Sequence, residues 1–166
     1  MRSRSKMLGL CCLLLVAACS SSGDLKMKTP KAAAIPPGHT VALDVTSPAD
    51  EDSRDVAHRM RVELFDRLVA EGVFRQVVAA KEPADYEMQV ALNGVDEVSQ
   101  GARIFFGVMA GSNELKAAVS LRDATTNAMV TEFDVAGESA AHPLSTESGM
   151  DSAVREAATK IITALQ

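Results

Sequence analysis

The sequence predicts an α/β (α+β) fold, a single-domain two-layer sandwich in which helices pack on a mixed sheet in the order β-α-β-β-β-β-α. Three observations lead to this prediction. Several short segments alternate apolar and polar residues, as half-buried strands do. Two longer segments repeat apolar residues every three or four positions, as amphipathic helices do. The length of 166 residues suits one globular domain and leaves no room for two substantial ones.

The first strand and the first helix follow from the pattern of residues 40–72. Alternation over 40–45 predicts a strand. Ser53 is expected to cap the helix that follows, and Gly72 to end it in the left-handed conformation. A second apolar row makes this helix hydrophobic on more than one side, so either the fold or a partner covers that row; we favour coverage within the fold. The two rows are Val56, Met60, Leu64 and Leu68, and Val62, Phe65 and Val69.

The second half of the chain predicts four more strands and a final helix. Asn93-Gly94 is expected to place a bulge in one strand, and residues 123–128 to form a turn. Ser148 and Asp151 resemble a capping box at the start of the last helix. The expected strands are 73–79, 86–98, 115–121 and 129–135, and the helix is expected to bury Val154, Ala157, Ala158, Ile161 and Leu165.

The N-terminus has the features of a lipoprotein signal peptide. A basic start is followed by the apolar run 7–16, which is too short for a helix that spans a bilayer of about 30 Å. The run Leu15-Val16-Ala17-Ala18-Cys19 looks like a bacterial lipobox, in which the cysteine becomes the acylated first residue, and Ser20 after it implies transfer to the outer membrane. We therefore divide the chain into a lipoprotein signal peptide (1–18), the lipidated Cys19 with a flexible tether (19–39) and an α/β lipoprotein domain (40–166).

Composition and charge exclude several classes of function. With 17 Lys and Arg against 22 Asp and Glu, and a net charge of -5, the chain lacks the basic face that nucleic-acid binding requires. Cys11 and Cys12 leave with the signal peptide and Cys19 carries lipid, so no thiol remains for a disulfide, a metal or catalysis. The three histidines share no metal spacing, and no pattern indicates a nucleophile or a phosphate loop. We expect no catalytic residues, no cofactor, no metal and no enzyme activity.

The centre of the domain resembles a known family. Residues 101–107, Gly-Ala-Arg-Ile-Phe-Phe-Gly, continuing through Ala110-Gly111, are similar to the glycine-rich centre of a bacterial lipoprotein family catalogued as domain of unknown function 4410. Tyr86 and the run 123–126 match the strand and turn that flank this centre. Asn127 stands where the family usually has Gly, a change that the left-handed region tolerates. The layout also looks like the small α/β domain shared by the curli secretion lipoprotein and the Tol translocation protein, which implies a role in protein binding or pore building.

The candidate interaction site is the most apolar run after the signal peptide, from Ile104 to Met109. Consecutive apolar residues cannot all face one side of a strand, so part of this run points away from the sheet. Three interpretations stand open: a core segment under the helices, an exposed patch for a partner or a second copy, and a loop that dips into the membrane. The candidate residues are Ile104, Phe105, Phe106, Val108 and Met109.

Together these features predict an outer-membrane lipoprotein that acts as a structural or protein-interaction module on the periplasmic face of the bacterial envelope. The N-terminal acyl chains on Cys19 would hold it to the membrane, and it would bind a protein partner or itself, with no nucleic acid. One alternative is a pore or secretion component in which residues 98–121 form a membrane hairpin. Another is a small-ligand carrier or an enzyme with an unrecognised site.

Overall fold

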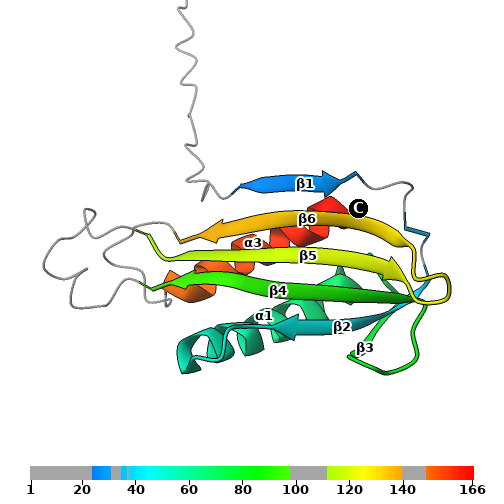
Figure 1. Ribbon diagram of the computed structural model, residues 1–166, viewed down its shortest axis with the longest axis horizontal. Coiled ribbons are helices and arrows are strands. Elements are labelled where there is room, and N and C mark those ends of the chain that lie inside the picture. Colours follow the sequence, from blue (N-terminus) through cyan, green and yellow to red (C-terminus); the bar gives the residue numbers. More distant parts are fainter. Residues whose placement is uncertain (1–23, 31–34, 37, 98–111, 140–148) are drawn as a thin grey trace, which may run out of the picture.

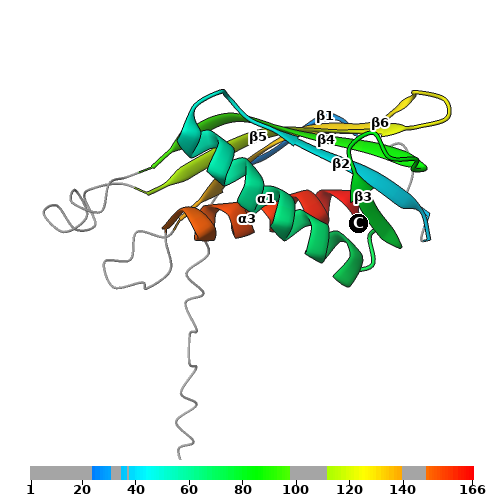
Figure 2. The same ribbon diagram turned by 90° about the horizontal axis from the view of Figure 1, so that it is seen from below.

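The computed structural model describes residues 24–30, 35–36, 38–97, 112–139 and 149–166. They form one six-stranded mixed sheet with two helices on the same face (Figures 1 and 2). The order is β-β-α-β-β-β-β-α, which confirms the predicted two-layer fold and adds one strand at its start. The elements are β1 (Leu25–Thr29), β2 (Thr40–Thr46), α1 (Glu51–Ala70), β3 (Gln76–Ala79), β4 (Tyr86–Asp96), β5 (Glu114–Asp123), β6 (Met129–Glu138) and α3 (Gly149–Leu165).

The strand order in the sheet is β1-β6-β5-β4-β2-β3. Strand β2 runs parallel to both of its neighbours, β3 and β4, whereas every other pair is antiparallel. A parallel connection needs a long crossover, and α1 supplies it between β2 and β3. Helix α1 packs on β2, β3 and β4, and α3 packs on β5 and β6 beside it. The edge strand β1 therefore lies beyond the two helices (Figure 1).

The core lies between the sheet and the two helices. Strand β5 is central, because it pairs with β4 on one side and β6 on the other. Its four alternate apolar side chains are buried among the helices, as the alternation predicts. The idea that 98–121 forms a membrane hairpin is wrong for residues 114–121, since they belong to this central strand. The buried residues of β5 are Leu115, Ala117, Val119 and Leu121.

The segment that was expected to be a flexible tether contains strand β1, so the prediction for residues 19–39 needs correction. Strand β1 is antiparallel to β6, with Leu25 opposite Val135 and Met27 opposite Phe133. The Lys28 ammonium donates to the Asp134 carboxylate over 2.6 Å on the other face. Only residues 20–24 separate Cys19 from the sheet, and five residues span at most about 18 Å. An acyl anchor on Cys19 would hold this edge of the domain near the membrane.

At turns and helix caps, individual residues determine the backbone conformation. A register shift between Leu92 and Gly94 confirms the predicted bulge in β4. Asn127 has φ of 57° and Gly72 has φ of 72°, so both adopt the expected left-handed conformation. Helix α1 begins earlier than predicted, because the Asp50 carboxylate accepts the Ser53 backbone N–H over 2.7 Å and acts as the N-cap. The expected Ser148 cap of α3 lies outside the described residues.

Candidate functional site

The outer face of α1 carries apolar side chains that nothing in the described part of the chain covers. Its inner row is buried against the sheet, as predicted. Val62, Phe65 and Val69 are 49%, 40% and 42% exposed, so the expectation that the fold covers this second row is wrong. The three positions are spaced by three and four residues and lie on one side of the helix. We call Val62, Phe65 and Val69 the outer stripe of α1.

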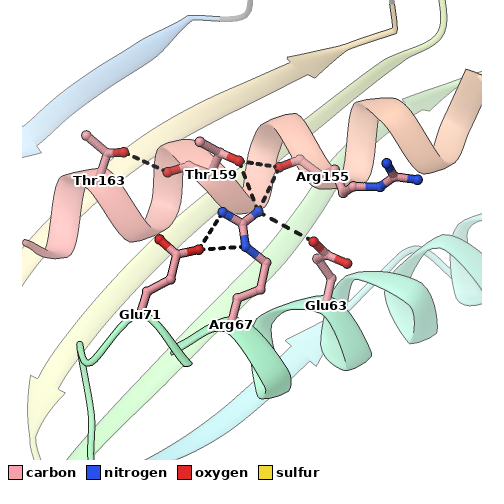
Figure 3. A network of polar contacts seen from close by, with 6 residues as sticks. All are labelled: Glu63, Arg67, Glu71, Arg155, Thr159 and Thr163. Atoms are coloured by element: carbon pink, nitrogen blue, oxygen red, sulfur yellow. Dashed lines mark hydrogen bonds and ion pairs between the residues drawn. The ribbon is translucent and has the colours of Figure 1, made fainter. Parts of the chain in front are cut away.

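Contacts with α3 fix the orientation of α1 about its own axis, and Arg67 forms one polar bridge between the two helices (Figure 3). Its guanidinium donates to the Thr159 hydroxyl over 3.0 Å and to the Arg155 backbone carbonyl over 3.3 Å. It also donates to Glu71, the C-cap residue of α1, over 2.8 Å and lies 3.4 Å from Glu63, one turn earlier on the helix. A planar guanidinium with several donors is well suited to such a bridge between two helices.

A second arginine joins the same two helices nearer their N-termini. Arg59 donates to the Asp151 carboxylate of α3 over 2.8 Å and forms an ion pair with Asp55 one turn earlier on α1. The hydrogen bond to Asp151, followed by the bond and charge of Asp55, raises the pKa of Arg59. With Arg59 and Arg67 both turned toward α3, the outer stripe faces away from α3 into solvent.

A smaller apolar patch lies at the opposite edge of the sheet. Leu25 and Met27 of β1 are 41% and 40% exposed. Their register with Val135 and Phe133 places them on the face of the sheet that the helices cover. Because α3 packs on β5 and β6 and β1 lies beyond them, neither helix of the described residues covers this part of the face. We call Leu25 and Met27 the β1 patch. Sequence reasoning missed it, although residues 25 and 27 alternate with two lysines.

The sheet face opposite the helices is polar. No helix of the described residues lies on it (Figure 2). Its side chains include an ion pair between Lys116 and Glu114 at 2.9 Å and the contacts of Lys28 with Asp134 and Glu132. The hydrogen bond and the charge of Glu114 raise the pKa of Lys116. Such a face is typical of a solvated sheet surface.

One histidine takes part in a polar cluster at the end of the sheet where β2 and β4 begin. His39 Nδ1 lies 3.3 Å from the Asp85 carboxylate, and the His39 ring meets Tyr86 edge to face at 5.3 Å. The Thr40 backbone N–H donates to Asp85 over 2.7 Å. That hydrogen bond, and then His39, lower the pKa of Asp85. The contacts tie the start of β2 to the start of β4, which is a structural role.

The described residues contain no group of three or more His, Cys, Asp or Glu side chains that could hold a metal ion. Asp55 lies one helical turn from His58, a spacing at which the two side chains could bind one metal ion, but it is paired with Arg59 instead. Within the same residues, no helix combines the length and the apolar character needed to cross a membrane. The arrangement thus offers two apolar surfaces, and each lies on the helix side of the sheet.

The sequence-predicted site residues lie outside the described part of the chain. These are Cys19 and the interaction loop Ile104, Phe105, Phe106, Val108 and Met109. The structure does describe the two strands that flank the loop, β4 and β5, and their ends pair through Asp96 and Glu114. Beside them, the Asn113 backbone N–H donates to the buried Ser139 hydroxyl over 2.9 Å. These bonds hold three strands together where the loop leaves the sheet.

Fold and site together define a two-layer α+β domain with an apolar helix face that no described residue covers. The chain belongs to the family described as a domain of unknown function, DUF4410, whose model matches residues 24–143. The predicted family is therefore confirmed. No curated protein matches the chain.

Two solved PelC structures share this fold at low sequence identity. A PelC variant from Paraburkholderia phytofirmans, a dodecamer, has a TM-score of 0.63 and 17% identity, covering 87% of this chain and 98% of its own. A second PelC dodecamer from that organism has a TM-score of 0.60 and 15% identity with the same coverage. XCC0632 from Xanthomonas campestris has a TM-score of 0.47 and 13% identity, covering 82% of this chain and 86% of its own. The likeness to PelC supports the fold assignment.

Proposed function

We propose that this protein is an outer-membrane-anchored periplasmic lipoprotein that acts as a structural or protein-interaction module of the bacterial envelope and has no catalytic activity. The observation that carries the proposal is the outer stripe of α1. Three apolar side chains are 40% to 49% exposed on a helix that Arg59 and Arg67 join to α3 on its other side. Clustered exposed apolar side chains usually mark a surface that binds another molecule.

The anchoring part of the proposal rests on the lipobox that ends at Cys19. The position of β1 supports it, because a lipid on Cys19 would hold the sheet edge close to the membrane surface rather than at the end of a long tether. The chain is acidic overall, with a net charge of -5, so lipid and not charge would provide the membrane affinity.

The assembly of PelC supports the interaction part. PelC, which shares this fold, is a dodecamer. Because a protein with this fold forms a multi-copy assembly, a second copy of this chain is the first partner to test for the outer stripe.

Membrane anchoring is tested by changing Cys19→Ser. We expect the variant to leave the outer-membrane fraction and to accumulate as a soluble or uncleaved form. Cys12→Ser is the matched control, since that residue lies in the predicted signal peptide and its change should leave fractionation as in the parent. Equal outer-membrane recovery of the Cys19 variant and the parent would overturn the anchoring proposal.

The interaction role is tested by site-specific photo-cross-linking in cells. A photoreactive phenylalanine analogue at Phe65 should give cross-linked protein species. The same analogue at Gln89, which is exposed on the polar sheet face, is the control and should give none. If position 65 cross-links no more than position 89, the outer stripe is not an interaction surface and the proposal fails.

A further inference from the structure

We propose that the outer stripe of α1 in one copy packs against the β1 patch of the next copy, so that the protein assembles head to tail. The proposal rests on the interaction function proposed above and names the partner as a second copy of this chain. It assigns a binding role to Leu25 and Met27 and gives the outer stripe a specific counterpart.

The first argument is that the two patches account for all of the large apolar side chains that stand exposed in the described residues. Those side chains are Leu25, Met27, Val62, Phe65 and Val69. The two patches lie at opposite edges of the sheet, because β1 is one edge strand and α1 packs near β3, the other. A contact between two copies of α1 would leave the β1 patch exposed, whereas a head-to-tail contact covers both patches at once.

The second argument is that both patches lie on the same side of the sheet. Six strands spaced about 4.8 Å apart span about 24 Å, whereas two packed helices cover roughly 20 Å. Helices α1 and α3 pack on β2 to β6, and neither packs extensively on β1 in the described residues. If β1 of one copy lies beside β3 of another, the outer stripe of the second copy faces the open position over β1. The neighbour's α1 would then extend the helix layer.

The lysines of β1 are the third argument. Strand β1 carries two lysines and no acidic residue, and Lys28 contacts Asp134 and Glu132 on the sheet face opposite the helices. Edge lysines oppose simple strand-to-strand pairing, which favours side-chain packing of the β1 patch over a continuous sheet.

Membrane attachment favours the same arrangement. Copies anchored through Cys19 all present the start of β1 toward one membrane, so all copies have the same orientation relative to the membrane. A contact between two different surfaces then repeats from copy to copy, and it gives a ring if the rotation closes. The dodecameric state of PelC shows that this fold occurs in a multi-copy assembly.

The test is cysteine cross-linking of the full chain in membranes with a short bismaleimide. A variant that carries both Met27→Cys and Phe65→Cys should give a ladder of species spaced by one protomer mass. Each single variant alone should give only the background of the parent chain, while a mixture of the two single variants in one cell should give a dimer. The matched control replaces Phe65→Cys by Thr163→Cys, an exposed position on α3, and should give no ladder.

Three results would overturn the proposal. Dimers from Phe65→Cys alone would show contact between two copies of α1, and dimers from Met27→Cys alone would show contact between two β1 edges. A double variant that reaches the outer membrane but forms no ladder would show that the partner is not a second copy in this arrangement. In that last case, photo-cross-linking at position 65 still decides separately whether the outer stripe binds another protein.

Discussion

Helices α1 and α3 cover the same face of one sheet and yet differ in what they show to solvent. Helix α3 buries its apolar side chains and exposes polar positions, among them Arg155, Thr159 and Thr163. Helix α1 also buries an apolar row but exposes a second one, at Val62 and Phe65 among others. The fold alone explains the composition of α3. The additional apolar row of α1 does not stabilise the fold that the structure describes, and this surplus indicates a surface used for binding.

The largest expected effect comes from truncating a buried side chain of α3. Ile161 is fully buried between α3 and the sheet, so Ile161→Ala should lower the free energy of unfolding by about 2–5 kcal/mol. Urea denaturation measures it. The corresponding truncation on the outer stripe, Val62→Ala, should cost far less because Val62 is half exposed. Equal losses in the free energy of unfolding for Ile161→Ala and Val62→Ala would show that the outer stripe of α1 contributes to the fold as much as the core of α3 does.

A second prediction concerns how closely α3 approaches the sheet. A Cβ at Gly137 would meet the backbone carbonyl oxygen of Ala153 and lie 2.9 Å from the Ala157 nitrogen. Gly137→Ala should therefore push α3 away from β6 and destabilise the domain by about 1–3 kcal/mol. Gly94→Ala is the control, since a Cβ there would only reach the Lys116 side chain at 3.9 Å. Equal thermal unfolding temperatures of the two variants would contradict this packing.

A smaller effect is expected at the start of α1. The Ser53 backbone N–H holds the pKa of Asp50 below its ordinary value of about 4. The cap contributes fully above that ordinary value and is lost as the pH falls through the lower pKa of the folded state. Asp50→Ala should therefore reduce stability modestly at pH 7 and flatten the loss of stability on acidification below about pH 4. A variant with an unchanged acid profile would show that the cap does not form.

The sequence predicted the helix and strand pattern well where periodicity was long. The alternation in β4, β5 and β6 and the four-residue spacing in α1 and α3 each appear as expected. Strand β1 was missed because only Leu25 and Met27 alternate there, within a segment rich in Lys and Ser. An edge strand of five residues gains its stability from pairing with β6, and that partner is more than one hundred residues away in the sequence.

The candidate site could be predicted only in part. The second apolar row of α1 is plain in the sequence, but periodicity states which residues share a face and not what lies next to that face. Its exposure follows from the position of α3, which Arg59 and Arg67 fix on the other side of α1. The expected interaction loop, from Ile104 to Met109, lies outside the described residues and stays a prediction.

The central claim is that the outer stripe of α1 serves association and not folding, and Phe65→Ser tests it most directly. Thermal unfolding and sedimentation velocity are measured on the same detergent-solubilised sample, with Gln89→Ser on the polar sheet face as the control. We predict that stability changes by no more than about 0.5 kcal/mol while the sedimenting mass falls below that of the parent, because Phe65 is 40% exposed. A sharp loss of stability, or an unchanged mass, would contradict the claim.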